Sequence, residues 1–132
     1  MKKVPIRHSS KKSLGFNSEA TLLRVCRDTL NILQGAGLLV YRRIHSTGIP
    51  NGKGRFRPNE DMQGMPDLLI WLKSGPVLAI ELKSSVGKTT ESQDLFRDAI
   101  ERMGHPYHIV NSISLLERLL ASHGVVHWVV KQ

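Results

Sequence analysis

Residues 64–83, GMPDLLIWLKSGPVLAIELK, contain the two apolar runs that decide the fold. The runs, residues 67–72 and 77–83, are rich in Leu, Ile and Val, and each has the length of a single strand. The four residues between them, Lys-Ser-Gly-Pro at 73–76, are of types that form tight turns. Two short apolar runs on either side of a turn predict an antiparallel β-hairpin.

The two acidic residues of this hairpin are predicted to lie close together. A turn centred on the Ser-Gly pair joins residues whose numbers add to about 149, so Asp67 lies within one residue of facing Glu81. Alternation along the second strand places Glu81 and Lys83 on one face with Ala79. The same alternation places the large apolar residues on the other face: Leu78, Ile80 and Leu82.

Two carboxylates on adjacent strands need a compensating cation. Unit charges about 5 Å apart repel by roughly 3 kcal/mol at an effective dielectric near 20. Lys83 offers one positive charge, and a divalent ion offers more, because Mg²⁺ commonly binds one or two carboxylates, several waters and substrate phosphate oxygens. Lys83, about 6.6 Å along the strand from Glu81, is placed to polarise a water beside such an ion. The alternative is an exposed hairpin edge with scattered charges.

A helix, a short strand and a long loop are predicted before the hairpin. The helix starts from an N-cap at Asn17 or Ser18 and ends at Gly35 and Gly37, and its apolar residues recur at helical spacing: Leu22, Leu23, Cys26, Leu30 and Leu33. Residues 38–45 form a strand that has one face made of Leu39, Tyr41 and Arg43. The Gly-, Pro- and Arg-rich loop at 46–63 is long enough to suspect a function.

Two further helices and two strands are predicted after the hairpin. The helix at 90–103 has a predicted buried stripe of Phe96, Ala99, Ile100 and Met103. A strand at 107–110, a helix at 114–122 and a strand at 125–130 complete the order α-β-β-β-α-β-α-β. This order predicts an α/β sandwich, a mixed β-sheet flanked by helices. A basic N-terminal arm, residues 1–16, precedes a single domain, residues 17–132.

The charge distribution indicates a polyanionic partner. The 132 residues carry 19 Lys and Arg against 11 Asp and Glu, a net charge of +8. Ten of the basic residues lie in two segments without acids, one before Glu19 and one between residues 42 and 57. Such clustering favours nucleic acid, since each neutralised phosphate releases counterions. The alternative is a solubilising tail and a charged loop.

The remaining composition excludes several protein classes. Apolar residues make up 40% and charged residues 23%, so neither a fibrous nor a disordered chain is expected. The longest apolar run, residues 68–72, is far below the roughly 20 residues of a membrane span, and no targeting signal is seen. The single cysteine, Cys26, excludes an intramolecular disulfide and a multi-cysteine zinc site. We expect a cytoplasmic protein of a bacterial or phage-infected cell.

The motifs of the hairpin and helices resemble the PD-(D/E)XK nuclease superfamily in its stand-alone VRR-NUC form. The resemblance rests on Gly64-Met65-Pro66-Asp67, on Glu81-Leu82-Lys83 fourteen residues later, on Gln93 of the next helix and on Glu19 of the first. It covers residues 19–120 and implies a restriction-endonuclease-like fold. It also implies an endonuclease that hydrolyses DNA phosphodiester bonds with Mg²⁺ or Mn²⁺ as cofactor.

The resemblance assigns the central roles to the hairpin. It implies that Asp67 and Glu81 ligate the metal together with the Leu82 carbonyl, and that Lys83 positions or activates the attacking water. For the two carboxylates and the lysine, these are the roles that the charge argument predicts.

Two helix residues have competing explanations. Glu19 lies on the helical line of Leu22 and is expected to face inward, where it could reach a metal-bound water or a second ion. A carboxylate is also favoured at a helix N-terminus by the dipole alone. The resemblance implies that Gln93 orients the catalytic groups, but Gln93 also forms a capping box with Thr90 that needs no chemistry.

DNA contacts are expected from the basic residues of the first strand and of two loops: Arg42, Arg43, His45, Lys53, Arg55, Arg57 and Lys88. The sequence Gly-Lys-Thr-Thr at 87–90 is similar to the end of a phosphate-binding P-loop. Leu82 stands where the first glycine of that loop is required. No nucleotide triphosphate site is therefore expected.

The resemblance also implies a substrate and an assembly. Stand-alone proteins that resemble this chain act as homodimers on four-way (Holliday) junctions, and a twofold dimer would double the net charge of +8 to +16. The candidate interfaces are the apolar segment 125–130, for which core burial is the commoner role, and the strand edge near Tyr41. The alternatives are a flap or general DNA nuclease, or a catalytically silent nucleic-acid-binding module.

Overall fold

The computed structural model describes residues 18–45, 49–50, 52–57, 59–84 and 88–125. The contacts among these residues form two compact units. The first unit holds residues 18–38, 82–84 and 109–125, and the second holds residues 39–81 and 88–108.

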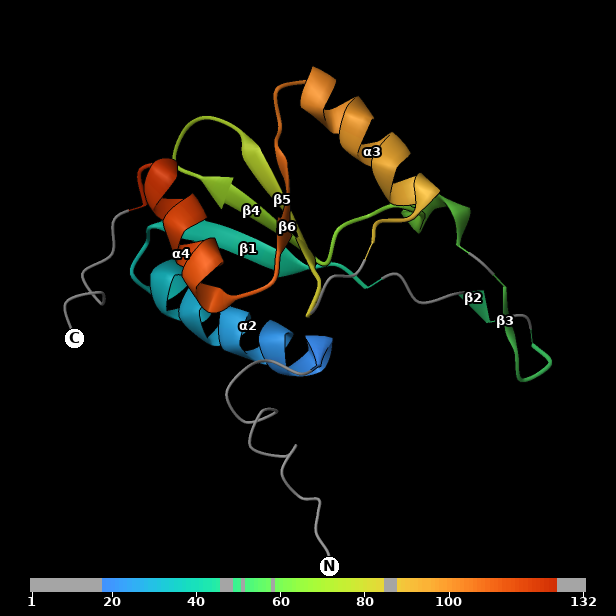
Figure 1. Cartoon of the computed structure of the whole chain (residues 1–132). Coiled ribbons are helices and arrows are strands. Elements are labelled where there is room, and N and C mark those ends of the chain that lie inside the picture. Colours follow the sequence, from blue (N-terminus) through green and yellow to red (C-terminus); the bar gives the residue numbers. More distant parts are fainter. Residues whose placement is uncertain (1–17, 46–48, 51, 58, 85–87, 126–132) are drawn as a thin grey trace, which may run out of the picture. The chain divides into compact units, whose positions relative to one another are not determined.

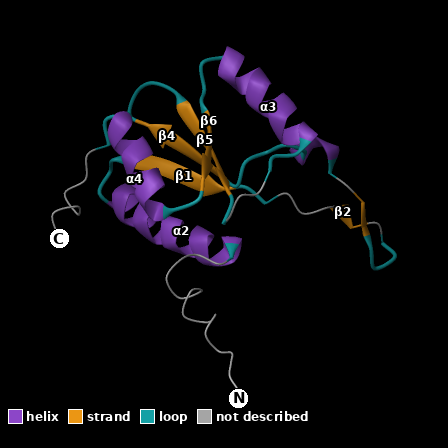
Figure 2. Cartoon of the chain, viewed as in Figure 1, coloured by secondary structure: helices purple, strands orange, loops and turns teal. Residues whose placement is uncertain are grey.

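Ten helical and strand segments follow one another in the described residues (Figures 1 and 2). In chain order they are α2 (Glu19–Gly35), β1 (Leu39–Arg43), β2 (Ile49–Pro50), β3 (Phe56–Arg57), η1 (Glu60–Met62), β4 (Leu68–Leu72), β5 (Val77–Leu82), α3 (Glu91–Arg102), β6 (Tyr107–Val110) and α4 (Ile113–Ser122). The predicted helices and the strands up to Val110 are confirmed, within a few residues at their ends. The predicted strand at 125–130 and the predicted arm at 1–16 lie outside the described residues, apart from the buried Val125.

Helices α2 and α4 pack against each other in the first unit. Ser18 caps α2, because its Oγ accepts a hydrogen bond from the Thr21 backbone N–H at 3.1 Å. The buried side of α2 consists of Leu22, Cys26, Leu30 and Leu33, four of the five residues predicted from the helical period. Ser112 caps α4 in the same way, and Leu116 and Leu120 are its buried residues. Apolar burial along these two stripes therefore stabilises the first unit.

Four strands form one sheet in the order β1-β4-β5-β6. Strand β4 is antiparallel to both β1 and β5. The backbone N–H groups of Ala79 and Lys83 donate to the carbonyl oxygens of Pro106 and Val110, so the bonds advance in the same direction along β5 and β6. This progression makes β5 and β6 parallel. The sheet is therefore mixed, as the order of elements predicted.

The loop at 46–63 is more structured than the sequence predicted. Strands β2 and β3 pair as a short antiparallel hairpin, with Ile49 opposite Arg57 and Pro50 opposite Phe56. The 3₁₀ turn η1 follows before the hairpin of β4 and β5. Gly52 and Gly54, at the tip of the small hairpin, both have positive φ, which glycine adopts without steric cost. The dense turn residues of this loop therefore support a hairpin.

The burial of the residues of α3 differs from the predicted buried stripe. Phe96 and Ile100 are half-buried, whereas Ala99 is exposed and Met103 is 74% exposed. Met103 is the C-cap residue and lies past the last turn of the helix. Helical periodicity predicts which residues share a face, but it does not predict how deeply each end of that face is covered.

Candidate active site

Asp67 and Glu81 face each other in the second unit. The register pairs Leu68 with Ile80 and Trp71 with Val77, and the same register carried one residue further places Asp67 opposite Glu81. The predicted register of the hairpin is thereby confirmed to within one residue, and its extension agrees with the expected proximity of the two acids. The Ile44 N–H donates to the Asp67 carbonyl oxygen at 2.8 Å, so the Asp67 backbone bonds to the β1 side. Asp67 and Glu81 are therefore not joined by backbone hydrogen bonds, and in such pairs the side chains approach to about 5 Å between Cβ atoms.

The two carboxylates differ in their exposure to solvent. Glu81 is 5% exposed and is the buried charged residue among those that the structure describes. Asp67 is half-buried and follows the buried Pro66. Strand β5 is covered on both faces, since Leu78, Ala79, Ile80, Glu81 and Leu82 are all buried. Burying a carboxylate in an otherwise apolar strand is costly, so Glu81 marks the place in this sheet where chemistry is expected.

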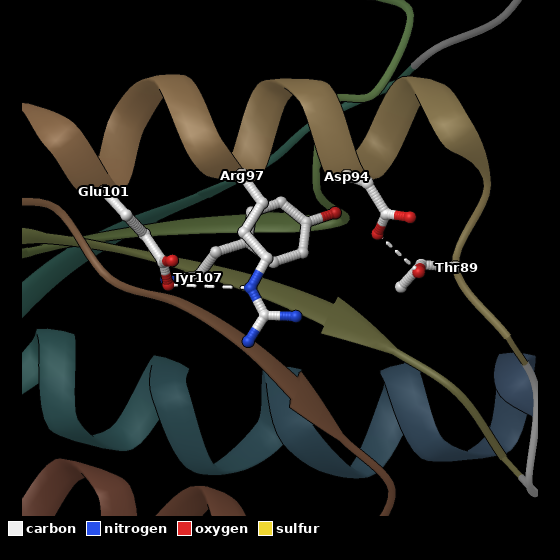
Figure 3. A network of polar contacts seen from close by, with 5 residues as sticks. All are labelled: Thr89, Asp94, Arg97, Glu101 and Tyr107. Carbon is white, nitrogen blue, oxygen red and sulfur yellow. Dashed lines mark hydrogen bonds and ion pairs between the residues drawn. The ribbon is translucent and has the colours of Figure 1, made fainter.

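Tyr107 places a phenol beside this pair. The ring is 1% exposed and packs edge-on against Phe96 of α3, with 6.4 Å between ring centroids and 69° between ring planes. Figure 3 shows the ring between α3 and the sheet, near Arg97 and Glu101. Burial, followed by the negative charges of Glu81 and Asp67, raises the pKa of Tyr107 well above its ordinary value. Arg97 opposes this effect.

The Tyr107 hydroxyl is buried and reaches no partner at ordinary hydrogen-bond geometry among the described residues. The Glu81 carboxylate raises the pKa of the phenol more through its charge than through hydrogen bonding. Nothing in the sequence marks Tyr107 as a site residue. A tyrosine in a short apolar strand is an ordinary core residue, and only the β5–β6 pairing brings it beside the carboxylates.

The turn before Asp67 is held against the start of α3. Gly64 has a φ of +81°, and a Cβ at this position would overlap the Ser92 carbonyl oxygen and crowd Phe96. The residue must therefore be glycine for both conformation and space. The Gly-x-Pro-Asp motif thus has a structural function, which is to let this turn approach α3.

Gln93 forms the capping box that the sequence predicted. Its Oε1 accepts from the Thr90 backbone N–H at 2.9 Å, and the Thr90 Oγ1 accepts from the Gln93 N–H at 3.1 Å. The Thr89 hydroxyl donates to Asp94 Oδ1 at 2.6 Å and further fixes the first turn (Figure 3). The capping role of Gln93 is confirmed, and its role in orienting catalytic groups stays a prediction.

The other residues assigned by the resemblance belong to the first unit. Leu82 is buried and Lys83 is half-buried, with the Lys83 N–H bonded to the Val110 carbonyl oxygen at 3.0 Å. Glu19 is exposed, so the expectation that it faces inward is wrong. Glu19 is the first residue of α2, where the helix begins, and the buried stripe starts one turn later at Leu22.

The structure separates the predicted DNA contacts. Successive strand residues point to opposite faces, so Arg42 and Arg43 leave β1 on different sides. Arg42 is exposed and lies on the face of Asp67, because its cross-strand partner is Leu69. Arg43 is half-buried, and its Nη1 lies 3.4 Å from Nδ1 of the exposed His45.

The remaining predicted contacts lie in loops. Lys53, Arg55 and Lys88 are exposed, whereas the Arg57 side chain lies outside the described part of the chain. A shallow depression of about 290 Å³ on α2 of the first unit contains none of the predicted site residues; it is lined by Ala20, Leu23, Arg24, Arg27, Asp28 and Asn31.

The donor set around Asp67 and Glu81 is compatible with Mg²⁺ or Mn²⁺. Among the described residues, no group of three or more His, Cys, Asp or Glu side chains is arranged to hold a metal ion. Mg²⁺ usually binds through one or two carboxylates and keeps several waters. Two facing oxygen-donor side chains, one of them buried, fit this requirement and do not fit a zinc site of nitrogen and sulfur ligands.

The fold of the chain is that of a known domain. No family model matches the sequence, and no curated protein matches it. A solved structure described as a VRR_NUC domain matches with a TM-score of 0.54 and 20% sequence identity, over 80% of this chain and 96% of that chain. No helix in the described residues has the length and apolar character needed to cross a bilayer. The mixed sheet, its helices and this match together show that the chain has the VRR-NUC fold, an α/β fold of the restriction-endonuclease-like type.

Proposed function

We propose that the protein is a divalent-metal-dependent DNA endonuclease of the PD-(D/E)XK type. The observation that carries the proposal is the Asp67–Glu81 pair, two carboxylates on facing strands with one of them buried. A protein that only binds nucleic acid gains nothing from burying a negative charge near phosphate. The shared fold with a VRR_NUC domain supports the same activity.

The hairpin residues have distinct roles in the proposed reaction. Asp67 and Glu81, with the Leu82 carbonyl oxygen, would hold Mg²⁺ or Mn²⁺. The bound ion would supply Lewis acidity at a phosphate oxygen and lower the pKa of a bound water. Lys83 positions the attacking water and offers a positive charge to the developing phosphorane. Gln93 and Glu19 are assigned supporting roles by the resemblance alone.

The proposed substrate is branched DNA. The net charge of +8 and the exposed Arg42, Lys53, Arg55 and Lys88 favour a polyanion. Paired cuts in a four-way junction need two sites related by a twofold axis, and a homodimer provides them. We therefore propose a homodimer that resolves four-way junctions.

Cleavage by purified protein tests the activity. Wild type is expected to cut DNA with Mg²⁺ or Mn²⁺ and not with EDTA. The substitutions Asp67→Ala, Glu81→Ala and Lys83→Ala are each expected to abolish cleavage and to leave binding largely intact, because these groups act on the transition state. Asp61→Ala and Lys73→Ala remove exposed charges of the same kinds and serve as matched controls. Full cleavage by any of the three site variants would remove that residue from the site.

A panel of junction, flap and linear DNA tests the substrate, and light scattering tests the assembly. Preference for four-way junctions by a dimer supports the proposal in full. A monomer that prefers flaps or linear DNA would make it a flap or general nuclease. Binding without cleavage of any substrate at any tested metal concentration would identify a silent binding module.

A further inference from the structure

Part of one sheet face in the second unit is not covered by other described residues. We call it the β1–β4 face and define it by Val40, Arg42, Leu69 and Trp71. Val40 and Trp71 are direct cross-strand partners and are 46% and 41% exposed. Arg42 is exposed, and Leu69, its cross-strand partner, is half-buried. Large apolar side chains that are paired and open to solvent on a sheet often mark a binding surface.

Another part of the same face is covered. Tyr107 neighbours Ala79 across the β5–β6 pair, and Phe96 of α3 packs on the Tyr107 ring. Ala79 is 1% exposed, in contrast to Val40 and Trp71 two strands away. Helix α3 therefore covers the face at the position of Tyr107 and leaves the β1–β4 face open.

The β1–β4 face is continuous with the candidate active site. Side chains two residues apart in a strand lie on the same face of the sheet. Leu69 and Trp71 of β4 therefore share a face with Asp67, which directly precedes the strand. Trp71 comes four positions after Asp67, a span of about 13 Å in extended chain. Nucleotides stacked as in B-DNA advance about 3.4 Å each, so this span corresponds to about four nucleotides, and to fewer where the strand is stretched.

The charge on this face favours DNA over a second copy of the chain. A twofold contact through the β1–β4 face would bring the Arg42 side chains of two copies towards each other, and like charges at an interface are unfavourable. A DNA strand instead offers phosphates to Arg42 and flat bases to Trp71. Indole is a sequence-tolerant stacking surface for bases.

We infer that Trp71, supported by Val40 and flanked by Arg42, stacks on an unpaired nucleotide of the strand whose phosphate lies at Asp67 and Glu81. The bases inside a duplex stack on one another and do not present a free face, so this contact requires unpaired or splayed nucleotides near the cut. The inference rests on the proposed nuclease function and narrows its substrate to branched DNA in which nucleotides beside the branch point are unpaired or splayed.

Binding without divalent metal tests the stacking contact. Fluorescence anisotropy compares a forked duplex that has single-stranded arms with the fully paired duplex of the same sequence. Trp71→Ala is expected to weaken binding of the fork about ten-fold, the loss expected for one stacked base, and to change duplex binding by less than about two-fold. Trp71→Phe keeps an aromatic ring and is expected to retain most of the affinity for the fork. Ile32→Ala removes an exposed apolar side chain of α2 and is the matched control.

A second measurement observes Trp71 directly. The chain has two tryptophans, so Trp128→Phe leaves Trp71 as the sole indole. Adding a single-stranded oligonucleotide is expected to quench its fluorescence through stacking. Unchanged fluorescence at saturating oligonucleotide would overturn the inference, as would an equal loss of fork and duplex binding by Trp71→Ala. A wild-type dimer that Trp71→Ala converts to a monomer would show that the face is a protein interface instead.

These outcomes are separable from failure of the proposed function. If Trp71→Ala weakens binding of the fork alone and the wild-type protein cuts no DNA, the stacking surface is supported and the nuclease function is rejected. Metal-dependent cleavage by a protein whose fork binding is unaffected by Trp71→Ala would retain the nuclease and reject the stacking surface.

Discussion

Glu81 lies directly across the β4–β5 pair from Asp67, and the buried member of the pair is Glu81. Two like charges at this spacing repel by about 3 kcal/mol at an effective dielectric near 20. The fold therefore keeps two like charges opposite each other on an otherwise apolar pair of strands, and a bound divalent ion would offset their repulsion.

Thermal unfolding with and without Mg²⁺ reports on this pair. Wild type is expected to gain stability as Mg²⁺ is added, because a ligand that binds the native state alone stabilises it by mass action. Glu81→Gln is expected to lose this gain and, in EDTA, to be no less stable than wild type. Asp61→Asn, at an exposed position, is expected to behave as wild type. A Mg²⁺-dependent rise in Tm that survives Glu81→Gln would place the ion elsewhere.

Gly64 belongs to the turn that precedes Asp67, and Gly75, in the turn between β4 and β5, is its matched control. Both have positive φ, but an added Cβ would meet Ser92 only at Gly64, whereas Gly75 has open space. Gly75→Ala is expected to cost about 1–2 kcal/mol of unfolding free energy from backbone strain. Gly64→Ala is expected to cost clearly more, because α3 must also shift. Urea unfolding midpoints check the difference, and equal losses would mean that α3 adjusts freely.

Arg42 and Arg43 are expected to contribute differently to DNA binding. Arg42 is on the face of Asp67 and Arg43 is on the opposite face. Arg42→Gln is therefore expected to flatten the slope of log K against log salt concentration by about 0.9, the value for one lost phosphate contact, and Arg43→Gln to leave the slope unchanged. Anisotropy titrations over a range of KCl concentrations measure both slopes. The reverse ranking would assign the DNA to the other face of β1.

Cys26 is expected to make the fold sensitive to alkali. Burial, and to a lesser extent the charge of Glu117, raises the pKa of Cys26 from 9.0 to about 11. The folded state therefore holds its proton more tightly than the unfolded state, so this stabilisation is complete below pH 9 and is lost as the pH rises through 11. Two pKa units correspond to about 3 kcal/mol at most.

Urea unfolding between pH 8 and pH 11 tests the Cys26 effect, because this range covers the rise of the Cys26 pKa from 9.0 to about 11. Cys26→Ala is expected to lose less stability than wild type over this range. Tyr107 also ionises with a raised pKa, but it is present in both proteins and does not affect the difference. Parallel pH profiles would show that Cys26 has the same pKa in the folded and the unfolded protein.

The local parts of the fold were predictable and the long-range parts were less so. The short turn between β4 and β5 determines the register, so the facing of Asp67 and Glu81 followed from the sequence. The caps at Ser18 and Thr90 were likewise readable from residue type. The position of Tyr107 depends on a parallel pairing across a helix, which has no local signal. The exposure of Glu19 and Met103 was missed because a helical period does not specify where burial stops at the helix ends.

The hydrogen bond from Arg42 Nη1 to the Tyr41 carbonyl oxygen, at 2.7 Å, also affects how copies of the chain can meet. Strand β1 is an edge of the described sheet, and the Tyr41 carbonyl points away from β4 because the hydrogen-bonded pairs of β1 fall at Val40 and Arg42. An incoming strand needs this acceptor to extend the sheet, and the guanidinium occupies it. The arginine therefore protects the edge against strand addition and fibrous aggregation, a protection that a glutamine at position 42 would weaken.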